Sequence, residues 1–186
     1  MKKLFMIAVC TAASGFIFAQ STQFGLKGGL NLASIKTNDG AEYDSRASLN
    51  VGGLAHIHLT PHFALQPELI YSGQGAERQD VKIKLGYINI PVLGQYMTGN
   101  GFRLETGPQV GFLVSAQNKS NEETVDVKDN YEGVDVSWAF GASYQFPHSG
   151  AGIDARYNLG LTNIYNGNTT VHNRVFSIGM FYQFIK

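Results

Sequence analysis

The sequence predicts an all-β protein, an eight-stranded antiparallel up-and-down transmembrane β-barrel. Three observations lead to this fold class. Apolar and polar residues alternate with period two through eight segments, which is typical of strands with two unlike faces. Short and long connections between these segments follow one another in turn. Charged residues make up 15% of the chain, below the roughly 25% typical of soluble domains.

Each expected strand has an apolar face and a polar face. In 46–59, for example, Leu49 and Val51 alternate with Asn50 and His56. No segment beyond residue 20 has a convincing helical period, so we expect a single domain. The strands are expected at about 23–34, 46–59, 63–75, 82–98, 102–117, 133–146, 151–163 and 174–185.

The connections indicate which kind of barrel this is. Three are tight turns, at 60–62, 99–101 and 147–150. The longer polar segments between them are 35–45, 76–81, 118–132 and 164–173. In an up-and-down barrel this order places every long loop at one end. Outer-membrane barrels have that asymmetry, with short periplasmic turns and long extracellular loops.

The same alternation fits a membrane barrel, with its apolar set outside, or a soluble lipocalin-like ligand carrier, with its apolar set inside. A soluble barrel needs a charged exterior, whereas the polar set here is largely Gly, Ser, Asn and Gln. Aromatic residues also lie toward the strand ends, where membrane barrels have interfacial girdles. They include Tyr71, Tyr96, Phe102, Tyr144 and Phe184. We therefore expect the membrane barrel and keep the carrier as an alternative.

The first residues have the features of a secretory signal peptide. Lys2 and Lys3 precede an apolar stretch over 4–18, and Ala19 offers a small residue for cleavage. We expect residues 1–19 to be removed and 20–186 to form the barrel of an integral outer-membrane protein. Cleavage lowers the basic count from 14 to 12 against 14 acidic residues. Such a chain has no basic excess to attract nucleic acid.

Three prolines lie within expected strands, namely Pro67, Pro91 and Pro108. Proline has no N–H for the ladder, and a closed sheet has no edge where a missing donor is harmless. We expect a bulge or a local break in the ladder at each one.

Four motifs resemble those of a known family. Residues 65–76 read LQPELIYSGQGA, and residues 87–93 read YINIPVL. Residues 106–111 read TGPQVG, and residues 154–161 read DARYNLGL. Together they resemble the Bacteroidetes outer-membrane β-barrel family, also described as porin family or PorT-like. The resemblance implies an eight-stranded outer-membrane barrel and accounts for the strand prolines, but it implies no single activity.

Charged strand residues that alternate with the apolar set should face the lumen. Four are basic and four are acidic: Lys27, Arg46, Arg103, Arg156, Glu68, Glu105, Asp135 and Asp154. Buried charge is tolerated only when it is paired and hydrogen-bonded, so we expect a network of ion pairs near the short turns. Because side chains can fill an eight-stranded barrel, this network predicts a plug. A small low-conductance pore is the alternative.

His56 and His58 are expected to join the same polar network, two residues apart on one strand. A His-x-His pair can contribute to a metal site, but the sequence marks no third ligand, so we expect hydrogen bonding and no metal. Ser72 and Ser115 are also expected in the lumen without an evident His partner. A nucleophile needs an adjacent base, so we expect neither enzymatic activity nor a cofactor.

The longest loop, 118–132, is acidic and does not match a calcium-binding pattern. Binding often resides in loops that a rigid scaffold presents. We therefore expect a structural or interaction scaffold that displays extracellular loops. Its expected partners are outer-membrane lipid, the barrel-assembly machinery during biogenesis, and an unidentified surface or envelope protein, with no role for nucleic acid.

Overall fold

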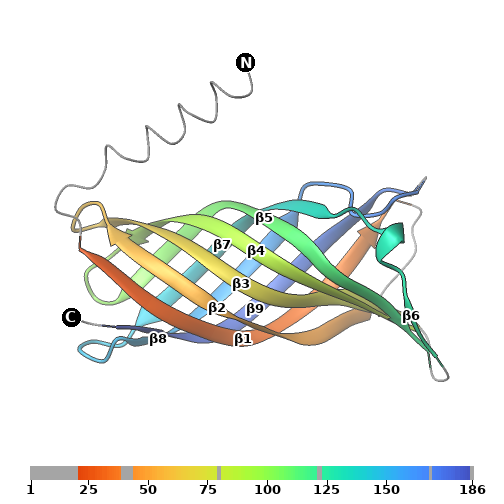
Figure 1. Cartoon of the computed structure of the whole chain (residues 1–186). Helices are drawn as coiled ribbons and strands as arrows, with labels where there is room; N and C mark the ends of the chain where they lie inside the picture. The colour runs from red at the N-terminus through yellow and green to blue at the C-terminus, as the bar shows by residue number, and fades with distance from the viewer. Residues whose placement is uncertain (1–20, 39–43, 79–80, 121–122, 168, 185–186) are drawn as a thin grey trace, which may run out of the picture.

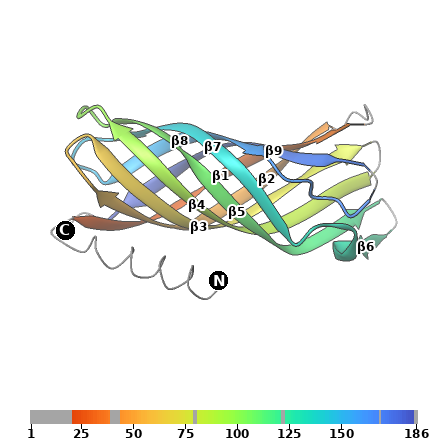
Figure 2. The same cartoon turned by 90° about the horizontal axis from the view of Figure 1, so that it is seen from above.

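Eight long antiparallel strands close a barrel in the computed structural model, which describes residues 21–38, 44–78, 81–120, 123–167 and 169–184 (Figures 1 and 2). Sequential barrel strands are neighbours, and β9 pairs with β1 to close the ring. The barrel strands are β1 (Thr22–Thr37), β2 (Asp44–His58), β3 (Phe63–Arg78), β4 (Val81–Met97), β5 (Phe102–Lys119), β7 (Val134–Gln145), β8 (Ala151–Gly160) and β9 (Val171–Gln183). The expected signal peptide lies outside the described residues.

Two short elements follow β5 at the loop end of the barrel. The strand β6 (Thr124–Asp126) pairs with β5, and the 3-10 turn η1 (Lys128–Asn130) comes next. Both project from the end of the barrel opposite the short turns (Figure 1). Among the described residues, no helix is both long enough and apolar enough to cross a membrane.

The apolar set of each strand faces outward. On β5, Leu104 is 51% exposed and Phe112 is 44% exposed, whereas Arg103 and Glu105 are 5% and 4% exposed. An apolar exterior around a polar interior suits a barrel surrounded by hydrocarbon. The soluble lipocalin-like alternative, which needs the opposite arrangement, is therefore wrong.

Three connections at one end are short, as expected: 59–62, 98–101 and 146–150. The expectation of a long loop at 76–81 is wrong. The pairing of β3 with β4 continues through Glu77↔Lys82 to Arg78↔Val81. The ends of β3 and β4 extend beyond the apolar outer surface of the barrel into water. Residues there can be part of a strand and still have charged side chains that face outward.

The strand prolines interrupt the ladders without shifting them. The β2–β3 pairing skips from Leu54↔Glu68 to Ile57↔Leu65, beside Pro67, and the register is the same on both sides. The β3–β4 ladder has a similar gap at Pro91, and the β4–β5 ladder has one at Pro108. The breaks thus occur where a donor is missing, and the bulges lie elsewhere.

One bulge changes which residues of β5 face inward. The β4–β5 register shifts between Gly86↔Ser115 and Tyr87↔Leu113, which leaves Val114 as the extra residue. Leu113 and Ala116 are both buried, whereas Ser115 is exposed on the outer wall. The expectation that Ser115 faces the lumen is therefore wrong, because an extra residue reverses the facing of every residue that follows.

Candidate functional site: a filled lumen

Arg156 on β8 is the centre of an ionic layer across the turn-end half of the lumen. Its Nη1 and Nη2 donate to the two carboxylate oxygens of Glu68 on β3, at 2.8 and 3.0 Å. Its Nε and Nη2 also donate to Oε1 of Glu105 on β5, at 3.0 and 2.8 Å. All three side chains are almost fully buried. One guanidinium therefore links β8 to two strands on other sides of the barrel, with the bidentate geometry that makes such pairs strong.

Lys27 on β1 extends this layer. Its Nζ donates to Oδ2 of Asp154 at 3.0 Å and lies 3.7 Å from Oε2 of Glu68. Gln66 donates to Glu68 at 2.7 Å, and Gln95 donates to Glu105 at 2.9 Å. The carboxylates thus accept hydrogen bonds as well as facing cations, which is the condition under which buried charge is stable.

Arg103 on β5 lies at the edge of the ionic layer nearest the short turns. Its Nη2 donates to the side-chain oxygens of Gln145 and Gln183, the latter at 3.3 Å. Its guanidinium carbon lies 5.8 Å from the centroid of the buried Phe181 ring, within cation–π range. With Arg103 included, three basic side chains face Glu68, Glu105 and Asp154, so the layer is balanced in formal charge.

The two histidines of β2 have different surroundings. His56 is fully buried, and its Nδ1 lies 3.3 Å from Oε1 of Gln66. His58 meets the His56 ring edge-on at 4.5 Å and is half-buried at the mouth, with Nδ1 3.4 Å from the Ser21 hydroxyl. In the part of the chain that the structure describes, no group of three or more His, Cys, Asp or Glu residues could hold a metal ion.

Little open space remains inside the ionic layer. The cavity bounded by Lys27, Arg103, Glu105, Asp154 and Arg156 has a volume of about 10 Å³. That is roughly the space of one water-sized sphere. This cavity is too small for a hydrated ion.

Amides and hydroxyls occupy the middle of the lumen. Asn50 donates to Oδ1 of Asn31 at 2.6 Å, and Asn31 donates to the Ser72 hydroxyl at 2.9 Å. Gln74 also donates to Ser72, at 3.1 Å, and accepts from Asn173. This layer carries no charge, so no ion pair is needed to stabilise it.

The loop-end half of the lumen is apolar, which the strand pattern alone did not predict. Buried side chains from five strands and from the segment after β8 form one cluster: Ile35, Ala76, Leu85, Tyr87, Leu113, Ala116, Ile164 and Val171. Val127, Tyr131 and Tyr165 from the loops pack against it.

Two charged residues expected in the lumen network lie away from the ionic layer. Asp135 accepts from the Thr162 hydroxyl at 2.9 Å, and Arg46 donates to the Gln74 carbonyl oxygen at 2.6 Å.

The loops above this cluster are joined to each other. Tyr131 and Tyr165 form an antiparallel bridge, and their ring centroids are 5.7 Å apart. The Glu132 amide donates to the Ile164 carbonyl, and the Asn166 amide donates to the Asn130 carbonyl, both at 3.0 Å. The segment after β6 is therefore fixed to the segment after β8 by backbone and ring contacts.

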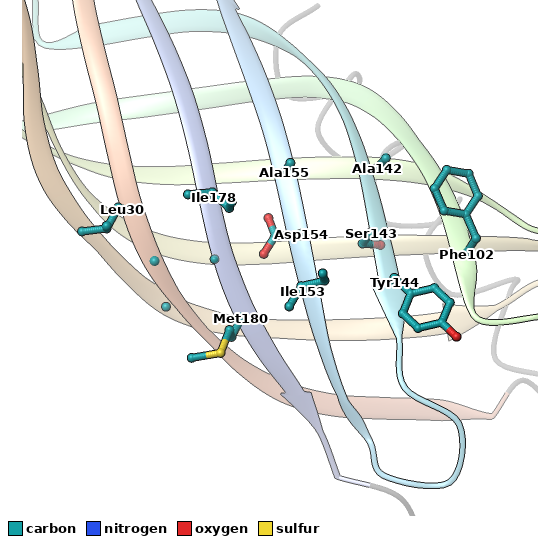
Figure 3. A pocket seen from close by; sticks show the side chains of 13 residues that line it. Leu30, Phe102, Ala142, Ser143, Tyr144, Ile153, Asp154, Ala155, Ile178 and Met180 are labelled. Carbon is teal, nitrogen blue, oxygen red and sulfur yellow. The ribbon is translucent and has the colours of Figure 1, made fainter.

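The outer wall has the features of a membrane-facing surface. At the turn end, exposed aromatic rings meet in pairs, with centroids 5.3 Å apart for Phe63 and Tyr96 and 5.6 Å apart for Tyr182 and Phe184. Such rings favour the membrane–water interface. Farther along the wall, small residues such as Ala142 and Ala155 lie between larger apolar ones and leave a shallow pocket of about 510 Å³ (Figure 3). Its mostly apolar lining makes it part of the hydrocarbon-facing wall.

Comparisons with known proteins agree with this architecture. The family model described as outer membrane protein beta-barrel domain matches residues 18–166. The chain belongs to this family. The barrel is therefore integral to the outer membrane.

Solved structures of other proteins share the fold. Neisserial surface protein A has a TM-score of 0.64 at 13% identity, over 88% of this chain and 99% of that one. Ail, the attachment invasion locus protein of Yersinia pestis, has a TM-score of 0.58 at 15% identity, with the same coverage of 88% and 99%. At these identities the likeness extends to the fold alone. No curated protein matches the chain in sequence.

Proposed function

We propose that this protein is a closed, non-enzymatic barrel that presents a rigid loop surface outside the cell. The observation that carries the proposal is the ionic layer, in which Arg156 joins Glu68 and Glu105 across the lumen and about 10 Å³ of space remains. The apolar cluster forms a second barrier above it. A permeation path would have to cross both layers, which favours the scaffold over the small pore.

The joined loops support the second half of the proposal. A binding surface is most effective when its loops are held in place before the partner arrives. The contacts of Tyr131 with Tyr165 and of Asn130 with Asn166 hold two loops together on a rigid barrel. The exposed carboxylates Glu123, Asp126 and Asp129 give this surface an acidic character suited to a basic protein partner.

Planar-bilayer recording tests the closed lumen. Residues 20–186 are refolded and inserted, alongside the variants Arg103→Ala and Glu105→Ala. We expect no channel events from the parent or from either variant, because the apolar cluster remains in all three. Discrete events from the parent, with an ion selectivity that changes in the variants, would contradict the scaffold and support the pore.

Thiol labelling of whole cells tests the presentation of the loops. The one cysteine of the chain is Cys10, within the expected signal peptide, so an introduced thiol would be unique in the mature protein. We expect a membrane-impermeant maleimide to label Asp126→Cys, at the exposed last position of β6. Asn100→Cys, exposed in a short turn, is the control and should stay unlabelled until the cells are broken. The reverse pattern would contradict the proposed orientation.

Within the family, we propose that the chain belongs to the Bacteroidetes PorT-like branch. The motifs at 65–76, 87–93, 106–111 and 154–161 support this placement. Outer-membrane lipid and the barrel-assembly machinery are the partners that an integral barrel requires, and a surface or envelope protein is the partner proposed for the loops.

A further inference from the structure

Three lysines gather on the outer wall at the loop end. Lys82 on β4 lies directly opposite Lys119 on β5, and Lys84 is two residues along the same face of β4. Directly opposed residues of an antiparallel pair have adjacent side chains, so two like charges in this position destabilise the sheet unless an anion lies between them.

The lysines line a groove that has more cations than anions. Its volume is about 530 Å³, and its charged residues are Arg46, Glu77, Lys82, Lys84 and Lys119. Glu77 is the single acidic residue among them, and it pairs with Lys82 at 3.2 Å. The Arg46 guanidinium is held by its hydrogen bond to the Gln74 carbonyl, a neutral group. Charge complementarity therefore calls for a ligand with more than one negative charge.

The position of the groove indicates the source of that anion. Lys84 points to the same side of β4 as Ile88 and Ile90, and Ile90 is 41% exposed on the membrane-facing wall. Ile88 is four positions along the strand from Lys84, a distance of about 13 Å. A lipid whose acyl chains pack beside Ile88 and Ile90 would place its headgroup at the groove.

We propose that this groove binds the phosphate groups of a glycolipid in the outer leaflet. The basic side chains would neutralise the phosphates while the apolar wall below them contacts the acyl chains. This lipid site on the barrel wall is separate from the acidic loop surface. It rests on the proposed orientation, with the loop end outside the cell, but not on a protein partner for the loops.

Titration with diphosphorylated lipid A tests the site. The folded parent in a neutral detergent is compared with the double variant Lys84→Gln/Lys119→Gln, and bound lipid is counted by native mass spectrometry. Each basic residue near an anionic lipid surface contributes about a factor of five to binding, so we expect at least about tenfold weaker binding by the double variant. The matched control is Lys36→Gln/Lys128→Gln, which removes the same charge from exposed positions outside the groove and should bind within about twofold of the parent.

Two further arms identify the ligand chemistry. Dephosphorylated lipid A should bind the parent as weakly as diphosphorylated lipid A binds the double variant. Inorganic phosphate at the same concentration should neither bind nor compete, because it lacks acyl chains. Equal affinity of parent and double variant, equal binding of both lipids, or competition by inorganic phosphate would each overturn the proposal.

Discussion

The two ends of strand β4 have opposite polarity. Over 88–95 the outward residues are apolar, such as Ile90 and Val92, and the inward ones are polar, such as Asn89 and Gln95. Over 82–87 the lysines face outward, while Leu85 and Tyr87 are buried in the lumen. The surroundings explain the difference, because the first stretch lies against hydrocarbon and the second reaches into water. The strand thus has an apolar outer face and a polar inner face within the membrane. At the loop end it has a polar outer face and an apolar inner face, as in a soluble protein.

The largest expected effect tests the polar interior of the membrane-embedded half. Arg156→Met removes the shared cation and leaves Glu68 and Glu105 buried beside each other. We expect the free energy of unfolding to fall by about 3–5 kcal/mol, measured by urea titration in lipid vesicles. Adding Glu68→Gln and Glu105→Gln to this variant should restore part of the loss. A decrease below about 1 kcal/mol for Arg156→Met alone would mean that water, and not Arg156, stabilises the carboxylates.

The next effect tests the apolar interior at the loop end. Leu85→Ala removes a side chain that is 2% exposed within the cluster, and we expect a loss of about 2–4 kcal/mol from the cavity it leaves. Leu32→Ala makes the same change at an outward position that is 50% exposed on β1. Lipid can refill that space, so the control should lose at least about 1 kcal/mol less. Equal losses would contradict a packed core inside the loop end.

A smaller effect tests the joined loops. Tyr165→Ala removes the ring contact with Tyr131, and an aromatic pair contributes about 0.5–1.5 kcal/mol. Local opening should therefore increase, and trypsin should cleave after the exposed Lys128 about fivefold faster in the folded protein. Tyr157→Ala, on the outer wall of β8, should be cleaved at the parent rate. No acceleration in Tyr165→Ala would show that other contacts fix the loop.

The smallest effect concerns the outer wall. Lys119→Glu replaces a pair of like charges with an opposite pair across from Lys82. Without anionic lipid we expect a gain of about 0.5 kcal/mol in the free energy of unfolding, and screening at 1 M salt should remove it. Lys36→Glu, at an exposed position of β1 outside the groove, should leave stability unchanged. A loss of stability in Lys119→Glu would mean that the two lysines do not interact through space.

The sequence predicted the fold because period two, turn positions and low charge all indicate the same barrel. The facing of Lys27, Glu68, Arg103, Glu105, Asp154 and Arg156 also followed from strand parity. Strand parity did not predict which of these charges contact one another. The partner of a side chain across a barrel depends on strand stagger, which no local pattern encodes. The bulge at Val114 likewise leaves no mark in a run of ordinary strand residues.

The apolar cluster was missed for a different reason. The expected strand 82–98 includes the alternation of Lys82 and Lys84 with Ile83, Leu85 and Tyr87, but the reversed polarity of these first residues was not recognised. That signal is present in the sequence. The signal can be recognised if the strand is expected to extend beyond the hydrocarbon region, where its outward residues face water.

The ion pair between Lys27 and Asp154 spans the seam at which the barrel closes. Lys27 is on β1 and Asp154 is on β8, with β9 between them, so their contact requires both ladders of β9 to have the native register. Closure with a slip of two residues would preserve every inward and outward facing, yet it would move the ammonium about 7 Å along the strand. A carboxylate would then be left alone in a medium of low dielectric constant. The buried charges therefore make the correct closure more stable than a slipped one. The apolar pattern alone does not distinguish the two closures.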